Sequence, residues 1–326
     1  MPTDSRFFTH HVLVVILIAV VMLAGCRSAA PDLGPTSQPT PTFTPRSTPL
    51  PTIATPPPPG SEDNPIVMLF TDVRNVSRSE INIAVDDVSA ALLESAGIAV
   101  DIQVAERGAD ALTALCASPA GPVAVAWVDG ITYAAALAQA CAVPALFIER
   151  ENGTGEQIVI VVPSASTIDN IIELENRRFC RISVSDAFTW LVPALMMQAS
   201  GVSPTSLRNI TDYDDTEALL QAVADRDCDA AGIASADLTA FDGDVRELPQ
   251  NATMPHAILM MPPSLPLGSR EALKDALIAL AENADSAALL QPLLAQTRIV
   301  RVTEIDLEGW DAFIAATGLN LATIGN

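Results

Sequence analysis

The sequence predicts an α/β protein whose body has two lobes of similar size, with a cleft between them. Apolar residues make up 49% of the 326 residues and aromatic residues only 4%, which is typical of aliphatic strands packed against Ala-rich helices. Short apolar runs alternate with helical patterns from residue 66 onward. This alternation comes in two successive series, which we interpret as two lobes, each with a mostly parallel sheet flanked by helices.

The first 26 residues are typical of an export signal. Residues 12–22 form an apolar run of eleven residues, well short of the ~20 that a membrane-spanning helix needs. Ala24 and Gly25 before Cys26 resemble the lipobox of bacterial lipoproteins, in which the cysteine is acylated, for example with palmitate. We expect a signal peptide ending at lipidated Cys26 and an extracytoplasmic protein of the cell envelope held to the membrane by lipid. An uncleaved anchor is the alternative.

Residues 27–65 predict a disordered linker. They contain twelve prolines among many Thr and Ser residues, and a stretch of this composition sustains neither helix nor strand. Extended as polyproline, the linker reaches at most ~120 Å at ~3.1 Å per residue. Whether it carries O-linked sugars is not decided by its composition.

The first lobe is expected over residues 66–156 and 257–326. Its strands are short runs of Val, Ile, Leu and Ala, and its helices fill the intervals between them. The expected strands are Ile66–Phe70, Ala99–Val104, Val123–Trp127, Ala145–Glu149 and Ala257–Met261, with helices near 79–96, 108–116, 132–141, 269–282, 285–295 and 307–317.

The second lobe is expected over residues 157–256. Strand–helix–strand units impose parallel pairing, and such sheets place a ligand at the carboxyl ends of their strands, where helices begin. Two lobes facing each other would make this edge a cleft that closes on a solute. The expected strands are Gln157–Val162, Arg181–Val184, Ser206–Thr211, Ala230–Ala234 and Val245–Leu248, with helices near 189–200 and 214–226.

Three segments of the sequence carry a family resemblance. They are WLVPALMMQASGVSP at 190–204, DDTEALLQAVADRDCDAAGIASADL at 214–238 and PHAILMMPPSLPLGSREALKDALIAL at 255–280. Together they resemble the periplasmic solute-binding proteins of phosphonate, phosphite and phosphate ABC transporters. The resemblance covers roughly residues 66–320. It implies a type 2 periplasmic-binding-protein fold that captures a small polar solute, phosphonate-like or related, and hands it to an ABC permease, with no cofactor and as a monomer.

The sequence departs from this family at the predicted ligand site. The family's turn before the Pro-bearing helix is typically Ser-Thr-Ser-Gly and holds an oxyanion, whereas this chain has Asp186, Ala187, Phe188 and Thr189. Asp72 and Asp129 follow two first-lobe strands in the same way. Three carboxylates at strand ends favour a cationic or polyhydroxyl solute over an anion. Alternatively, these residues cap the helices that follow.

The candidate ligand site combines these carboxylates with hydroxyl and aromatic side chains near the same strand ends. Aromatic faces there can stack on a sugar, a base or a quaternary amine, although burial in the core is the alternative for each of them. The residues are Asp72, Trp127, Asp129, Thr132, Tyr133, Ser185, Asp186, Thr189, Trp190 and Ser235.

The cysteines beyond Cys26 predict one disulfide in each lobe. Cys116 and Cys141 each precede a first-lobe strand, and Cys180 and Cys228 each precede a second-lobe strand. Because parallel strands start at one edge of a sheet, each pair can reach the ~4.4–6.8 Å Cα separation of a disulfide. Free buried thiols are the alternative.

Composition and motifs exclude several other functions. A net charge of −22 argues against a nucleic-acid partner. The body contains a single histidine, His256, and no zinc spacing, nucleophile elbow, P-loop or dinucleotide motif, so we expect neither a metal site nor an enzyme. An enzyme on the same two-lobed fold and a ligand-free envelope interaction lipoprotein remain the alternatives.

Overall fold

The computed structural model describes residues 56–71, 76–117, 122–150, 153–284, 286–295, 298–303 and 307–320. Cys26, the predicted signal peptide, most of the predicted linker and Asp72 lie outside the described residues. Within the described ranges, no helix has the length and apolar character needed to cross a membrane.

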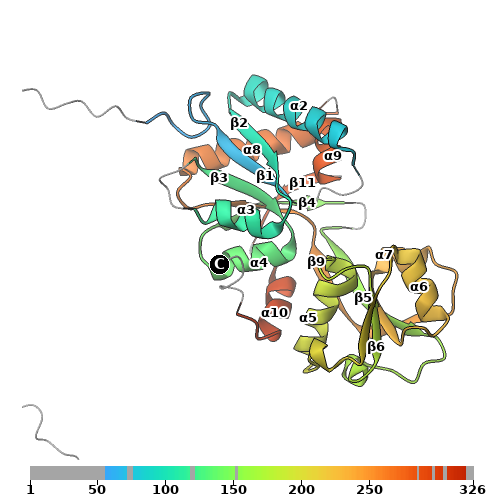
Figure 1. The fold of residues 1–326 in the computed structure, drawn as a ribbon. Coiled ribbons are helices and arrows are strands. Elements are labelled where there is room, and N and C mark those ends of the chain that lie inside the picture. Colours follow the sequence, from blue (N-terminus) through green and yellow to red (C-terminus); the bar gives the residue numbers. More distant parts are fainter. Residues whose placement is uncertain are drawn as a thin grey trace, which may run out of the picture. The chain divides into compact units, whose positions relative to one another are not determined.

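The first lobe is built on a six-stranded sheet with the order β11-β4-β10-β3-β1-β2 (Figure 1). β1 pairs with β2 and β3 in parallel, whereas β10 runs antiparallel to β3 and β4, and β11 antiparallel to β4. The strands are β1 (Ile66–Phe70), β2 (Val100–Val104), β3 (Ala124–Val128), β4 (Val143–Glu149), β10 (Ile258–Met261) and β11 (Arg298–Arg301).

Helices cover both faces of this sheet. The alternation along β1 and β3 sends Met68, Phe70 and Trp127 to one face, where they pack in a core with α2, α8 and α9. Leu69 and Val128 point to the opposite face, toward α3 and α4. The helices are α2 (Arg78–Ala96), α3 (Gly108–Leu115), α4 (Gly130–Ala138), α8 (Leu267–Glu282) and α9 (Ala287–Leu294). The last helix, α10 (Glu308–Ala316), packs instead on α4, β9 and α5.

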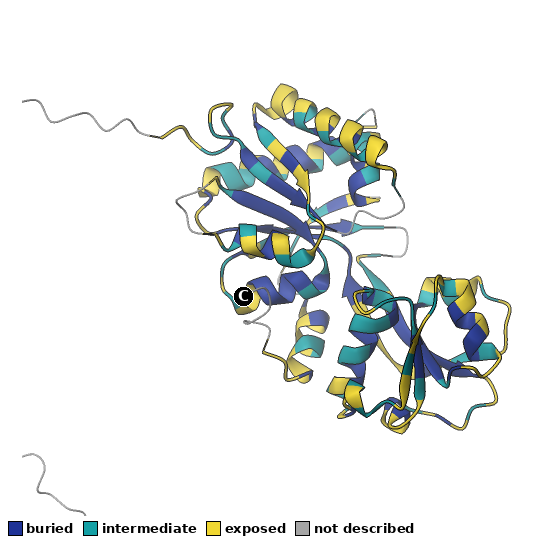
Figure 2. Cartoon of the chain, in the orientation of Figure 1, coloured by how far each residue is buried: buried dark blue, intermediate teal, exposed yellow. Residues whose placement is uncertain are grey.

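The second lobe is built on a five-stranded sheet with the order β7-β6-β8-β5-β9. β6 pairs in parallel with β7 and β8, and β5 pairs antiparallel with β8 and β9. Figure 2 shows a buried sheet centre and helices with exposed outer faces: β5 and β8 are mostly buried, whereas the edge strands β7 and β9 carry exposed residues. The elements are β5 (Gly155–Pro163), β6 (Arg178–Arg181), α5 (Val192–Ala199), β7 (Asn209–Asp212), α6 (Thr216–Ala224), β8 (Ala230–Ala234), α7 (Ser235–Thr239) and β9 (Val245–Pro255), with short helical turns at Ile171–Leu174, Ala187–Leu191 and Pro204–Ser206.

The two-lobed α/β fold predicted from the sequence is confirmed, with one difference in strand direction. The sheets are mixed rather than mostly parallel, because the segments that connect the lobes join the sheets as antiparallel strands and β11 adds an antiparallel edge strand to the first sheet. β5 enters the second sheet directly after β4, and β10 enters the first sheet directly after β9, so neither follows a crossover helix.

Two neighbouring segments connect the lobes. One runs from the end of β4 to β5, and the other from the end of β9 to β10. The backbone N–H of His256 donates to the carbonyl of Thr154 over 3.0 Å, and that of Ile148 donates to Ala257 over 3.1 Å. The paired segments therefore act as one two-stranded connection.

Both predicted disulfides are present. Cys116 and Cys141 have Cα atoms 5.0 Å apart, and Cys180 and Cys228 have Cα atoms 5.9 Å apart. Each bond ties the start of one strand to a neighbouring element within its own lobe.

Candidate functional site

A cavity of about 270 Å³ lies beside the connection between the lobes. Its walls come from the end of β1, the start of α4, the connecting segments, the turn before α5 and the C-terminal end of α9. The lining residues are Thr71, Val76, Asp129, Arg150, Glu156, Phe188, Met254, Pro255, His256, Ala257, Gln291, Pro292, Leu293, Leu294 and Ala295.

Asp129 is the predicted site residue that the structure places in the cavity wall. It follows β3 and caps α4, accepting hydrogen bonds at Oδ1 from the backbone N–H groups of Ile131 and Thr132, both over 2.8 Å. The Thr132 hydroxyl donates to Oδ2 over 3.0 Å. One carboxylate thus takes three donors at the start of a helix, an arrangement that N-terminal caps share with bound anions.

Asp186 repeats this arrangement in the second lobe. Its Oδ1 accepts from the backbone N–H groups of Phe188 over 3.0 Å and Thr189 over 2.7 Å, and from the Thr189 hydroxyl over 2.9 Å. The buried Thr189 hydroxyl also accepts from the backbone N–H of Ile182. Phe188, the residue after next, lines the cavity. The cap interpretation of both aspartates is therefore observed, and the two caps lie at corresponding places in the two lobes.

A second acidic side chain lies near Asp186. Burial raises the pKa of Asp237, and the charge of Asp186 raises it further. Ser235, at the start of α7, lies on the same short helix, and the exposed Ser185 hydroxyl lies 3.3 Å from that of Ser183. This end of the second sheet thus combines carboxylates and hydroxyls, although these side chains do not line the cavity.

The structure does not bring the three predicted aromatic residues to the cavity. Trp127 is fully buried in the first-lobe core. Tyr133 is also buried, and its hydroxyl donates to Asp311 of α10 over 3.1 Å. The Trp190 ring is covered by the Arg181 guanidinium, 4.6 Å from its centroid, and packs edge-on against Phe179.

Sequence reasoning missed the contribution of the connecting segments. Arg150, Glu156 and His256 all line the cavity, and burial together with the nearby charge of Arg150 lowers the pKa of His256 to about 4. His256 is therefore neutral at pH 7. The signal available in the sequence was position, because these residues lie at the two predicted junctions between the lobes.

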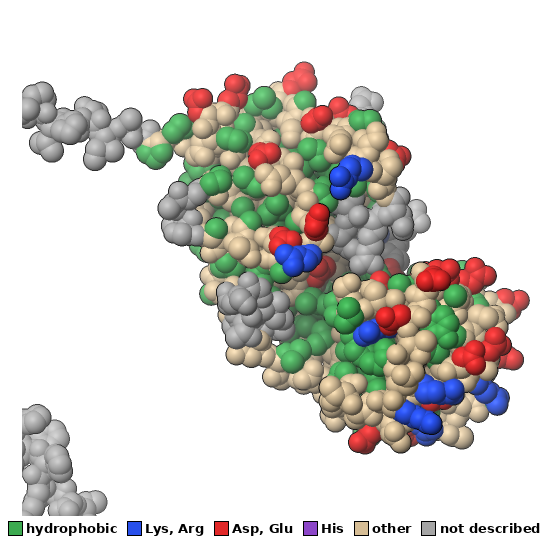
Figure 3. Space-filling model, viewed as in Figure 1, with side chains coloured by type: hydrophobic (Ala, Val, Ile, Leu, Met, Phe, Trp, Pro, Cys, Tyr) green, Lys and Arg blue, Asp and Glu red, His purple; other side chains and the backbone are tan. Residues whose placement is uncertain are grey.

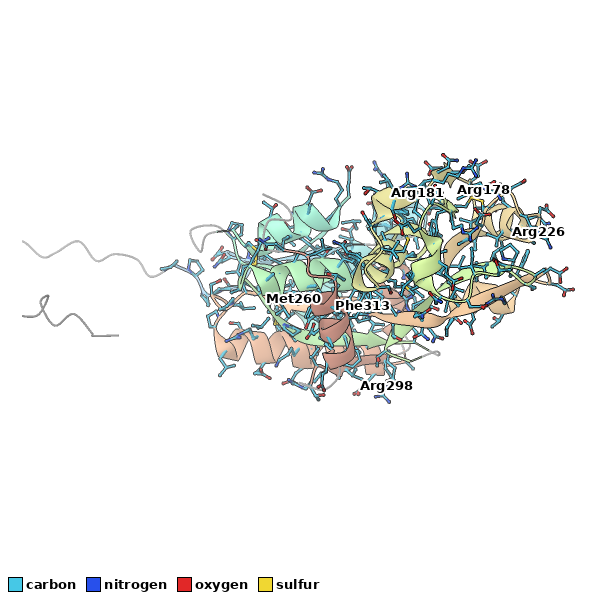
Figure 4. The ribbon with its side chains drawn as sticks, turned by 90° about the horizontal axis from the view of Figure 1, so that it is seen from below. Arg178, Arg181, Arg226, Met260, Arg298 and Phe313 are labelled. Atoms are coloured by element: carbon cyan, nitrogen blue, oxygen red, sulfur yellow. A yellow bond between two sulfur atoms is a disulfide. The ribbon has the colours of Figure 1, made fainter. Side chains whose placement is uncertain are left out.

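The basic residues of the second lobe lie apart from the cavity. Figure 4 shows Arg178, Arg181 and Arg226 on the second lobe, and none of them lines the cavity. Arg178 pairs with Asp229 over 2.8 Å, and Arg181 pairs with Asp212 over 2.8 Å. On the face shown in Figure 3, acidic side chains are spread over both lobes. Among the described residues, no cluster of three or more His, Cys, Asp or Glu side chains could hold a metal ion.

Comparison with known protein families identifies the family of this two-lobed protein. The model of the periplasmic substrate-binding proteins of phosphonate ABC transporters matches residues 73–307. The chain belongs to this family. Its members bind small solutes outside the cytoplasmic membrane and deliver them to ABC permeases, so the predicted family, solute-binding function and extracytoplasmic location are confirmed.

Solved structures share the fold of this substrate-binding protein at low sequence identity. A Xanthomonas citri protein bound to ATP has a TM-score of 0.62 at 15% identity, over 78% of this chain and 96% of that chain. PhnD1 from Prochlorococcus marinus in complex with methylphosphonate has a TM-score of 0.51 at 13% identity, over 76% and 96%. A binding protein component of an ABC phosphonate transporter from Pseudomonas aeruginosa has a TM-score of 0.50 at 14% identity, over 79% and 96%. No curated protein matches the sequence.

Proposed function

We propose that this substrate-binding protein holds its solute in the cavity beside the connecting segments and delivers it to an ABC permease after the lobes close. One observation carries the proposal: the cavity takes walls from the first lobe at Asp129, from the second at Phe188 and from the connection at His256. A change of angle at the connection therefore changes the size of the cavity. Its volume of about 270 Å³ suits a small solute.

Solute binding is tested by calorimetry and thermal unfolding of the full-length chain with panels of phosphonates, phosphate, amines and sugars. The proposal expects one class to raise the unfolding temperature, because a ligand that binds only the folded state stabilises it. Phe188→Ala should weaken that binding, whereas Phe241→Ala, at a residue of the same lobe that does not line the cavity, should leave it unchanged. Equal effects of the two substitutions would contradict the location.

The proposal includes a lipid anchor. The apolar run at residues 12–22 and the small residues before Cys26 support a signal peptide cleaved at a lipidated cysteine, followed by a linker at 27–65. We assign residues 66–156 and 257–326 to the first lobe and 157–256 to the second. Cys26→Ser should abolish the incorporation of radiolabelled palmitate. The variant should then be found either in the soluble fraction or as a precursor that keeps its signal peptide. Palmitate labelling of the variant would contradict the anchor.

We also propose that the protein binds its solute as a monomer and without turning it over. The one histidine of the body is buried beside Arg150 with a pKa of about 4, which leaves it a poor proton carrier at neutral pH. Mass spectrometry of any bound solute, recovered after prolonged incubation, should return it unchanged. A converted product would favour an enzyme on the same fold, and sedimentation at a dimer mass would contradict the monomer.

A further inference from the structure

The two helix N-termini that face the predicted cleft are already occupied by carboxylates of the chain itself. At the start of α4, Asp129 accepts two backbone N–H groups and a hydroxyl, and at the start of the turn before α5, Asp186 accepts the same set of donors. An oxyanion bound at a helix N-terminus uses these same N–H groups. A phosphonate would have to displace a covalently attached carboxylate or lie against its charge at either place.

The charges that line the cavity point the same way. Two carboxylates, on Asp129 and Glu156, share the wall with one guanidinium, on Arg150. Arg150 Nη2 donates a hydrogen bond to the carbonyl of Leu294 over 3.4 Å, so part of the guanidinium charge is directed at the end of α9. His256 adds no charge at neutral pH because its pKa is about 4.

The remaining wall favours a positive ligand through one aromatic residue. The last turn of α9, residues 291–295, also lines the cavity, but Arg150 already donates to its Leu294 carbonyl, so the partial negative charge of this helix end and the Arg150 charge offset each other. Phe188, an aromatic residue, lines the second-lobe side of the cavity, and aromatic rings attract organic cations.

We propose that the cavity selects a small organic cation, an amine or a quaternary ammonium, over phosphonate and other oxyanions, because Asp129 fills the helix N-terminus in the cavity wall and Asp186 fills the corresponding one next to the wall residue Phe188. This inference rests on the proposed solute-binding function and names the class of its ligand. The ammonium group lies against the Asp129 and Glu156 side of the wall, and its carbon substituents lie against Phe188.

The first experiment is isothermal calorimetry of the full-length chain in detergent with choline, putrescine, methylphosphonate, inorganic phosphate and glucose. Choline or putrescine should bind at least roughly tenfold more tightly than the two anions, since a single well-placed charge contact is worth about that much. Asp129→Asn, which keeps a cap acceptor but removes the charge, should weaken amine binding by a similar factor. Asp215→Asn is the matched control, because Asp215 caps α6 and does not line the cavity.

The second experiment asks whether the carboxylates exclude anions. Glycine is tolerated at an N-cap and supplies no side-chain acceptor, so Asp129→Gly and Asp186→Gly expose the helix N–H groups without filling the space. These variants should gain phosphate and methylphosphonate binding relative to the parent, and Asp215→Gly should not. Thermal unfolding of each variant checks that it is folded.

The outcomes separate this inference from the function on which it rests. Tighter binding of methylphosphonate or glucose than of either amine by the unsubstituted chain would overturn the inference and leave solute binding intact. A lack of any anion gain in both glycine variants would overturn the blocking role of the aspartates. Failure of every compound in the wider panels to bind would instead count against the solute-binding function and, with it, the choice of a cation.

Discussion

The indole Nε1 of Trp310 donates a hydrogen bond to the backbone carbonyl of Gly130 over 2.9 Å, joining positions 180 residues apart. Trp310 lies on α10 and Gly130 begins α4, directly after the cap Asp129. A Cβ placed on Gly130 would lie 3.0 Å from Pro255 Cδ and 3.0 Å from Trp310 Cε2. The C-terminal helix, the end of β9 and the first turn of α4 therefore meet beside the cavity wall.

Trp310→Phe should destabilise the protein by about 1–3 kcal/mol, because the buried Gly130 carbonyl loses its indole donor while most of the packing is kept. Urea unfolding of the full-length chain measures the change. Glu308→Gln on the same helix is exposed and should change stability by less than about 0.5 kcal/mol. A similar loss for both substitutions would indicate that the hydrogen bond contributes nothing specific.

Gly232→Ala should be one of the most damaging single-methyl additions in the second lobe. A Cβ at this position of β8 would lie 2.1 Å from Pro193 Cγ in the first turn of α5, so the helix must move away from the sheet. Overpacking of this kind costs about 1–3 kcal/mol or more.

The matched control for Gly232 is Gly268, in the first turn of α8. A Cβ there meets nothing within 4 Å, and alanine is the better helix former, so Gly268→Ala should stabilise the protein by up to about 1 kcal/mol. Thermal and urea unfolding of the two variants should therefore give opposite signs. If both substitutions stabilised the protein, the packing of α5 on β8 would be looser than described.

Removing the disulfides should destabilise each lobe. The bonds join residues 25 and 48 positions apart, and loop-entropy reasoning assigns about 3–4 kcal/mol to each, with the longer loop contributing slightly more. Cys116→Ser with Cys141→Ser, and Cys180→Ser with Cys228→Ser, remove one bond at a time. Urea unfolding of each protein with and without reductant checks the values. Reductant should destabilise each double variant less than the parent, because one of the two disulfides is already absent.

The buried His256 should make stability fall in mild acid. Its pKa is about 4 in the folded protein against 6.5 for an unperturbed histidine, so between these values the unfolded chain binds more protons than the folded one. The stability linked to His256 is fully present above about pH 6.5 and falls by about 3 kcal/mol as the pH approaches 4.

Urea unfolding of the parent and His256→Gln proteins from pH 4 to pH 7.5 measures this contribution. The difference between the two proteins should shrink or reverse toward pH 4, since glutamine binds no proton. Carboxylates whose pKa is lowered by an ion pair, such as Asp229 beside Arg178, respond in both proteins alike and cancel in the comparison. A difference that is constant with pH would contradict a neutral, buried His256.

Most strands and helices could be predicted from the sequence to within a few residues, and the deviations have local causes. The predicted strand Arg181–Val184 shares only Arg181 with β6, which spans Arg178–Arg181. β6 ends there because the Thr189 hydroxyl accepts a hydrogen bond from the backbone N–H of Ile182 and the chain turns toward the Asp186 cap. The edge strand β11 was missed because its four residues begin and end with arginine and show no apolar run. β9 runs on to Pro255, well beyond its predicted end, through alternating residues that pair with β5.

The candidate site was predicted less completely. The capping geometry of Asp129 and Asp186 followed from their place at strand ends, since a carboxylate before a helix has nearby N–H groups to accept. The fate of the aromatic residues did not follow. Whether Trp127 faces a core or a cleft depends on which side of the sheet the helices α2 and α8 cover, and period-2 alternation leaves the two sides equivalent.

The sequence by itself determined the two series of strands and helices, the family and the carboxylates at the strand ends, because each of these depends on local spacing. The cysteine pairs could be predicted as well, because strands of a parallel sheet start at one edge. Only the tertiary structure decided the wall of the cavity. Arg150 and His256 come together because two segments about a hundred residues apart in sequence pair as the connection between the lobes, and α9 adds its C-terminal end from still further along the chain. Contacts of that range come from packing, on which local sequence patterns carry no information.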